Sequence, residues 1–233
     1  MYSLRDVDDI SDYVPSRSII DTLVIDETDL RSLKAFTRVS YRTSFGSSGH
    51  RTFSIDPIKG KAEGRVILLH GAPGTGKTYS AECLAEWNER PLLRLSCADI
   101  GTEPEDIQAR LNKWFRYTYH WNSFLLIDEA DVYLHQRSSR STLNEEAIIS
   151  AFLQSLGYYR GIIYLTTNRV LKFDDAIHSR VSLILQYPNL GEKEKKRIRE
   201  QHLTTLENTK RYDIWKGARS TFEEDIAQGR IDR

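Results

Sequence analysis

Residues 65–78 read RVILLHGAPGTGKT, and they carry the clearest structural signal in this chain. An apolar, partly β-branched run stops at Gly71, and Gly71–Thr78 then follows the spacing G-x-x-x-x-G-K-T before a helical pattern begins. The glycines let the backbone turn its N–H groups around phosphate oxygens, and the start of the following helix adds unpaired donors and a favourable dipole. The stretch therefore predicts a strand, a phosphate-binding loop and a helix start. The alternative is a glycine-rich turn without a ligand.

Two residues of this loop have specific expected roles. Lys77 is expected to reach the β- and γ-phosphates of a nucleotide, and the Thr78 hydroxyl to ligate Mg²⁺. The candidate nucleotide-binding residues of the loop are Gly71, Ala72, Pro73, Gly74, Thr75, Gly76, Lys77 and Thr78.

The composition bounds the class of protein. With 233 residues, 39% of them hydrophobic, the chain can bury one main core and a small appendage. Lys plus Arg and Asp plus Glu are equal at 33 each, so no global field favours nucleic acid or an anionic membrane. The two cysteines, Cys83 and Cys97, form no C-x-x-C pair, which favours a reducing compartment. No targeting signal or membrane segment is seen, and we expect an intracellular protein, cytoplasmic or nuclear.

The apolar pattern along the chain predicts alternating strands and helices. Residues 1–20 read as an extended arm, 23–25 as a short strand, and the following segment as a helix to about Val39, capped by Asp26 or Thr28. Residues 40–49 read as a loop. A capping box is expected at 102–105. Further strands are expected at 92–96, 124–127, 161–165 and 181–185, and further helices at 77–88, after residue 102 and at 144–158. Such an alternation predicts a parallel sheet covered on both faces, with the ligand at the carboxyl ends of the strands.

Polar residues stand where two of these strands end. Asp128 and Glu129 follow the strand at 124–127, and we expect Asp128 to hold Mg²⁺ with Thr78 and Glu129 to orient the attacking water. A solvated acidic turn is the alternative. Asn168 follows the next strand, where a neutral amide can bind both the γ-phosphate and the water, although it could also be a simple turn asparagine.

These motifs together resemble those of the AAA+ ATPases. Residues 71–78 resemble a Walker A motif, 124–129 a Walker B motif and 166–168 a sensor-1 strand end, and the runs 95–102, 166–170 and 173–180 are similar to a fungal group of AAA-domain proteins. The resemblance implies an α/β, three-layer P-loop NTPase core with parallel strand order 5-1-4-3-2 and a partial C-terminal helical lid. The implied division is an N-terminal arm and helix at 1–50, a core at 51–188 and a lid at 189–233.

The resemblance also implies assembly. Arg180 corresponds to an arginine finger that acts on nucleotide held by a neighbouring subunit, in a homo-oligomeric ring for which six subunits is one option. A surface arginine paired with Asp174 or Asp175 is the alternative. The segment Asp99–Gly101 lacks the aromatic residue typical of polypeptide-threading pore loops.

The function expected from these residues is Mg²⁺-dependent ATP hydrolysis, with Glu129, Asn168 and Arg180 catalytic, coupled to remodelling of an unidentified macromolecule. One alternative is an ATP-binding assembly switch with little turnover. Another is a clamp-loader-like nucleic-acid machine, suggested by the basic run at 193–199. The glutamates within that run favour a solvated helix face, so nucleic acid is not the expected partner.

Overall fold

The computed structural model describes residues 13–39, 64–134, 142–169 and 175–208. The predicted loop at 40–49 lies outside the described residues. The chain divides into two compact units, Met1–Asn189 and Leu190–Arg233, which are described separately below.

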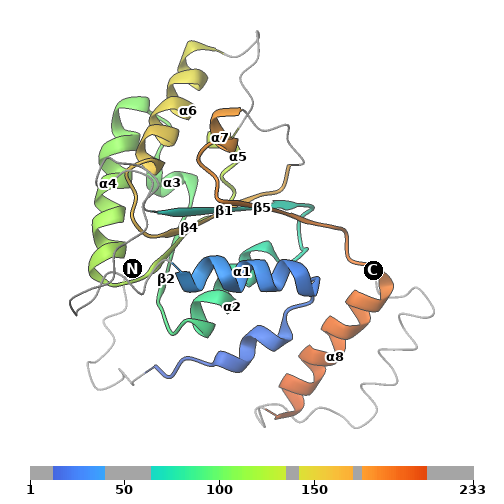
Figure 1. The fold of residues 1–233 in the computed structure, drawn as a ribbon. Helices are drawn as coiled ribbons and strands as arrows, with labels where there is room; N and C mark the ends of the chain where they lie inside the picture. Colours follow the sequence, from blue (N-terminus) through green and yellow to red (C-terminus); the bar gives the residue numbers. More distant parts are fainter. Residues whose placement is uncertain (1–12, 40–63, 135–141, 170–174, 209–233) are drawn as a thin grey trace, which may run out of the picture. The chain divides into compact units, whose positions relative to one another are not determined.

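Five parallel strands form the central sheet of the first unit (Figure 1). They are β1 (Arg65–Gly71), β2 (Leu92–Leu95), β3 (Phe124–Ile127), β4 (Ile162–Thr167) and β5 (Leu183–Tyr187). The order across the sheet is β2-β3-β4-β1-β5, which confirms the predicted order 5-1-4-3-2. The central strands are apolar and almost fully buried because helices cover both faces. All five carboxyl ends therefore meet at one edge, where the predicted site residues follow.

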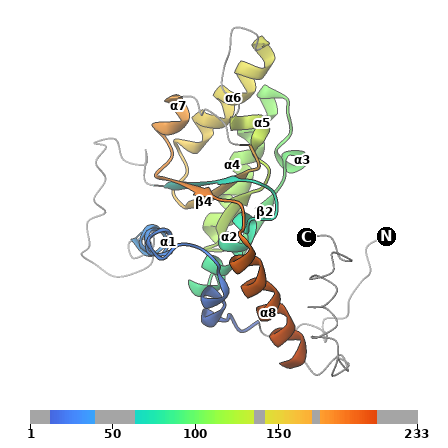
Figure 2. The same ribbon diagram turned by 90° about the vertical axis from the view of Figure 1, so that its right-hand side faces the viewer.

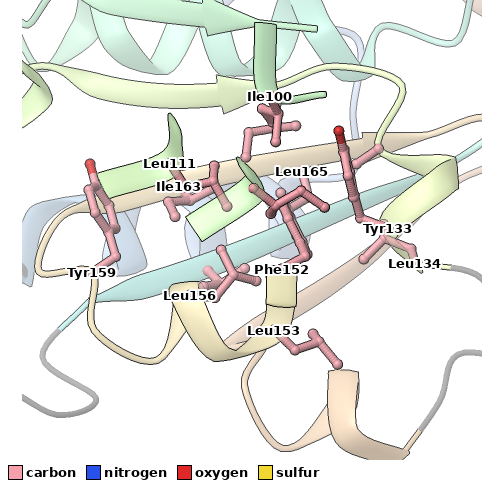
Figure 3. Packing of buried hydrophobic residues seen from close by; sticks show 14 of the residues in the cluster. Ile100, Leu111, Tyr133, Leu134, Phe152, Leu153, Leu156, Tyr159, Ile163 and Leu165 are labelled. Atoms are coloured by element: carbon pink, nitrogen blue, oxygen red, sulfur yellow. The ribbon is translucent and has the colours of Figure 1, made fainter. Parts of the chain in front are cut away.

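Helices form the outer layers (Figures 1 and 2). One face of the sheet carries α1 (Glu27–Val39) and α2 (Lys77–Trp87), and the other carries α3 (Cys97–Ile100), α4 (Pro104–His120), α5 (Asp131–Leu134), α6 (Leu143–Leu156) and α7 (Asp175–His178). Figure 3 shows part of the core under α4 and α6, where Phe152 points toward Leu165 of β4. Phe152 also stacks on Tyr133, with ring centroids 4.6 Å apart. This core fixes α5, and with it the chain just after β3.

The N-terminal arm departs from its predicted structure. The short strand predicted at 23–25 is wrong: a 3-10 helix, η2 (Arg17–Thr22), precedes an irregular segment, and Ile20 and Leu23 pack into the core beside α2. A run of three apolar residues suggested a strand, but burial of Ile20 and Leu23 against α2 decides the conformation instead. The helix that follows is confirmed, and the Asp26 carboxylate caps it by accepting the Thr28 N–H at 2.8 Å.

The predicted capping box at 102–105 is also wrong. Glu103 occupies the N-cap of α4 without a side-chain hydrogen bond, and Pro104 fills the first turn. The capping box belongs instead to α3, where Asp99 accepts hydrogen bonds from the backbone N–H and hydroxyl of Ser96. The segment after β2, which the sequence suggests is a loop, therefore contains a four-residue helix.

The second unit contributes one described helix, α8 (Glu192–Asn208). Its charges pair along the helix, as in Lys195–Glu192 at 3.3 Å and Lys196–Glu200 at 4.0 Å. Residues 209–233 lie outside the described residues, so the lid at 189–233 stays a prediction. No described helix has the length and apolar content to span a membrane.

Candidate active site

The loop between β1 and α2 has the backbone that its glycines predict. Gly71, Gly74 and Gly76 have φ values of 149°, 74° and 96°, which side-chain-bearing residues rarely adopt. Gly71 also lies against β5, because a Cβ built there would stand 2.2 Å from the Tyr187 carbonyl oxygen. The Thr75 hydroxyl donates to the Ala72 carbonyl at 2.8 Å and closes the loop on itself. Only glycine at position 71 lets the loop leave the sheet this close to β5.

Lys77 is held inside this loop. The residue is 6% exposed, and its Nζ donates to the carbonyl oxygens of Gly71 at 2.9 Å and Ala72 at 2.7 Å. Burial lowers the pKa of Lys77, and the nearby carboxylates of Asp128 and Asp131 oppose that shift. The carboxylates thus favour the charged ammonium, which is the form that binds phosphate.

Thr78 and Asp128 meet as the sequence predicts. The Thr78 hydroxyl donates to the Asp128 carboxylate, with distances of 3.1 and 3.3 Å to its two oxygens. A hydroxyl and a carboxylate are hard oxygen ligands of the kind Mg²⁺ prefers, and Mg²⁺ is commonly bound by one or two protein groups together with substrate phosphates. The pair therefore fits Mg²⁺. The described residues contain no cluster of three or more His, Cys, Asp or Glu side chains that could hold a metal alone.

Arg94 also contacts this carboxylate. Its Nη2 lies 2.5 Å from Asp128 Oδ2, and its side chain is 60% exposed against 13% for Asp128. Arg94 stands on β2, and β2 pairs with β3 so that Leu95 lies opposite Ile127, one residue before Asp128. Arg94 was not among the residues expected at the site, although the alternation of side chains along β2 could have placed it there.

Thr166 joins the two acidic residues. Its hydroxyl donates to Asp128 and accepts the backbone N–H of Glu129 at 3.1 Å, while its carbonyl accepts the Ala130 N–H at 2.8 Å. Glu129 has a φ of 54°, an unfavourable conformation for a non-glycine residue. The Cys97 thiol donates to the Glu129 carbonyl at 3.4 Å. The Glu129 peptide is thus held on both sides, and its side chain is exposed at the strand ends.

The next threonine holds another carboxylate. Thr167 donates its hydroxyl to Asp131 and accepts the Arg169 N–H at 3.2 Å. The Thr-Thr end of β4 was predicted as part of a strand end, without roles for the two hydroxyls. The register of β3 against β4, in which Ile127 lies opposite Leu165, is the signal that could have assigned them.

The remaining predicted residues lie at the same edge or beyond it. Asn168 directly follows β4 and is exposed. Arg180 follows α7 and is exposed, and its Nη1 donates to the Ala176 carbonyl at 2.9 Å and the Ser179 hydroxyl at 3.3 Å. The alternative partners of Arg180, Asp174 and the side chain of Asp175, lie outside the described residues. The structure thus assembles Lys77, Thr78 and Asp128 directly, with Glu129 and Asn168 at the adjacent strand ends.

A parallel sheet of this order, with a glycine loop, a buried lysine and a threonine–aspartate pair at its carboxyl edge, defines a P-loop nucleoside triphosphatase fold. Residues 67–189 match the model of the family described as "ATPase family associated with various cellular activities (AAA)". The chain belongs to this AAA family. Membership supports ATP binding and hydrolysis by an AAA module.

Similar proteins agree with this assignment. The chain is 30% identical over 139 residues to the ATPase family AAA domain-containing protein 3A homolog of Drosophila melanogaster, a match covering 58% of this chain and 23% of that protein. It is 28% identical over 139 residues to the ATPase family AAA domain-containing protein 3A of Homo sapiens, covering 58% of this chain and 24% of the relative. The chain therefore matches about a quarter of the length of these relatives.

A solved structure, the HORMA:CdnC:Trip13 complex of E. coli MS115-1, is similar over 60% of this chain and 53% of its own chain, at 23% identity and a TM-score of 0.48.

Proposed function

We propose that this chain binds ATP with Mg²⁺ and hydrolyses it, and that hydrolysis drives the remodelling of a macromolecule that binds the assembly. The observation that carries the proposal is the meeting of the Thr78 hydroxyl with the Asp128 carboxylate beside the buried Lys77 ammonium. Asp128 and Asp131 lie near the buried Lys77 in the glycine loop. Burying charged groups lowers folding stability unless the charges are compensated, so stability alone does not explain this arrangement. Phosphate and Mg²⁺ binding gives each of these groups a use.

In this proposal each residue of the site has a separate role in binding or hydrolysis. Lys77 exchanges the Gly71 and Ala72 carbonyls for the β- and γ-phosphates, and the loop N–H groups bind the phosphate oxygens. Glu129 accepts a hydrogen bond from the attacking water, and Asn168 fixes the water and the γ-phosphate. Mg²⁺, held by Thr78 and Asp128, would neutralise charge on the phosphates.

The proposed active unit is an oligomer. Arg180 is exposed and binds only oxygen atoms of its own turn in the contacts described for it, Ala176 and Ser179. Its guanidinium is therefore available for phosphate held by a neighbouring copy, in keeping with the rings that AAA proteins often form. Ring size, the macromolecule remodelled and the division into arm, core and lid stay predictions.

The test is ATP binding and phosphate release by the wild type and by Lys77→Ala. We expect Lys77→Ala to lose binding of a fluorescent ATP analogue while keeping its unfolding temperature, since Lys77 is the cation inside the loop. Lys196→Ala is the matched control, because Lys196 is an exposed lysine of α8. Wild-type affinity in a folded Lys77→Ala variant would reject the site. ATP binding and assembly by a wild type without phosphate release would instead favour the assembly switch.

A further inference from the structure

An aromatic surface lies on one flank of α4, away from the nucleotide site. It consists of Trp114, Tyr117 and Trp121, and we call it the aromatic flank. Tyr117 stacks on Trp121 with ring centroids 5.2 Å apart and planes at 11°, and Trp114 meets Tyr117 edge to face at 5.7 Å. Trp121 is nevertheless 55% exposed and Tyr117 36% exposed. The rings fix one another in place, so they offer apolar area to a ligand at little further entropy cost.

The aromatic flank points away from α6. The residues of α4 that meet α6 and the chain after it are Gln108, which bonds Gln154 at 2.7 Å, and Phe115, whose ring lies 4.5 Å from that of Tyr159. Because successive helical residues are about 100° apart, the aromatic flank falls on the opposite side. Arg110 shares that side, and its guanidinium lies against Gly101, which ends the helix following β2. The side of α4 that carries the aromatic flank therefore faces the end of α3, the helix that follows β2.

No strand among the described residues pairs with the outer edge of β2. β2 stands at the end of the sheet and pairs with β3 on one side. Leu92 and Leu93 are only partly buried, whereas every residue of β3 is buried. Unpaired strand edges next to apolar side chains are ready positions for another segment of chain.

The described chain begins next to this surface. Tyr13 shares a cavity with Arg90, Pro91 and Leu92, at the start of β2. The arm is fixed there, because Tyr13 bonds the Glu86 carboxylate and Arg17 bonds Glu89 at 2.7 Å. Arg90 in turn donates to the carbonyl of Asn122, the residue after Trp121, at 3.2 Å. Residues 1–12 are therefore attached where β2 begins and α4 ends.

We propose that residues 1–12 of this chain dock on the aromatic flank and the open edge of β2. Twelve extended residues span at most about 40 Å, whereas Trp114 and Trp121 are only about 10 Å apart along the helix axis, so the segment reaches the whole surface. Tethering gives it an effective concentration of about millimolar, which favours it over a free ligand.

The charge and the apolar pattern of residues 1–12 also suit binding to the aromatic flank. Residues 1–12 carry four aspartates and one arginine, a side-chain net charge of −3, and Leu4, Val7 and Ile10 recur every third residue. Residues 107–123 contain Arg110, Lys113 and Arg116 and no acidic residue, and Arg110 is paired with Asp106 at 3.1 Å. The Lys113 ammonium lies 5.7 Å from the Trp114 ring centroid and 6.0 Å from that of Tyr117. Aspartates between aliphatic residues match a surface of rings beside the Lys113 ammonium.

Hydrogen exchange of the intact chain tests the docking. We expect the backbone amides of β2 and of the last two turns of α4 to exchange about tenfold faster when Asp6, Asp8, Asp9 and Asp12 are all changed to Asn, because a bound segment protects the amides it covers. Trp121→Ser, a change at an exposed side chain, is expected to act in the same way. Tyr158→Ser is the control, since Tyr158 is a 63% exposed aromatic residue outside the aromatic flank, and it should leave the exchange rates unchanged.

A peptide in solution gives the second measurement. The peptide of residues 1–12, added to the variant with four asparagines, should restore protection, and the same peptide with its aspartates changed to Asn should not. Wild-type exchange rates in both the four-Asn and Trp121→Ser variants would overturn the proposal. So would protection that rises with protein concentration, because the occupant would then be a second copy. Neither measurement requires ATP turnover, so failure of the ATPase proposal leaves this one testable.

Discussion

Replacing Thr166 by valine removes the single hydroxyl that joins the two acidic residues of the site. Valine keeps the branched shape, and Thr166 is 1% exposed, so the packing of β4 is preserved. Asp128 loses one donor, although Thr78 and Arg94 still contact it. The Glu129 N–H loses its acceptor, while the φ of 54° stays unfavourable.

The magnitude follows from these two bonds. A hydrogen bond to a charged group contributes about 1.5–3 kcal/mol, and a buried N–H without a partner costs about 1–3 kcal/mol. Neither loss applies in full, because Thr78 and Arg94 still contact Asp128 and Glu129 is exposed to water, so we expect the unfolding free energy to fall by about 1–3 kcal/mol rather than by the sum. If the same free energy is lost in positioning Glu129, turnover should fall about 5- to 140-fold, since about 1.4 kcal/mol corresponds to a factor of ten.

The assay is phosphate release across a Mg²⁺ titration, with urea unfolding in parallel. Thr166→Val should need more Mg²⁺ for half-maximal turnover but bind metal-free ATP as the wild type does, and Thr166→Ser should recover turnover because it restores the hydroxyl. Thr37→Val is the matched control, a 1% exposed threonine of α1 that bonds only its own helix in the contacts described for it. Wild-type turnover and Mg²⁺ dependence in Thr166→Val would show that the Thr166 hydroxyl does not position Asp128 and Glu129.

Three further predictions concern the loop, the subunit interface and the core. Gly71→Ala should lower the unfolding free energy by more than about 2 kcal/mol in urea titrations, because its Cβ would meet the Tyr187 carbonyl, whereas Gly74→Ala, with open space around it, should cost about 1 kcal/mol; equal losses would contradict the close approach to β5. Arg180→Ala and Glu129→Gln should each turn over slowly alone and regain phosphate release when co-expressed, with mixed oligomers confirmed by mass; no recovery in verified mixtures would argue against a finger supplied between subunits. Phe152→Ala should destabilise the fold by about 3–5 kcal/mol in thermal or urea unfolding, since Phe152 is fully buried against Tyr133; a loss below 1 kcal/mol would show that this core is loosely packed.

The sequence predicted the elements whose signal is local. Residues 65–78 gave a strand, a loop and a helix because glycines and a sharp change of hydrophobic pattern mark each boundary, and Asp128 was placed because carboxyl ends of parallel strands share one edge. The contact of Arg94 with Asp128 and the roles of the Thr166 and Thr167 hydroxyls were not predicted. They depend on the register of β2, β3 and β4, which the sequence does not show directly. The strand predicted at 23–25 is wrong because burial against α2 outweighs the local apolar run. The helix α3 was not predicted because a helix of four residues is too short to show a helical hydrophobic period.

The most direct test of the ATPase account is one comparison of Glu129→Gln with the wild type, measuring ATP affinity and phosphate release on the same preparations. The amide keeps the shape of the carboxylate but accepts hydrogen bonds more weakly, and positioned acid–base groups contribute about 10²–10⁴-fold to rate. We expect Glu129→Gln to keep wild-type ATP affinity and to lose at least about 100-fold in turnover. Wild-type phosphate release by Glu129→Gln would contradict it and move the catalytic role to another group, with Asp131, held by Thr167, the next candidate.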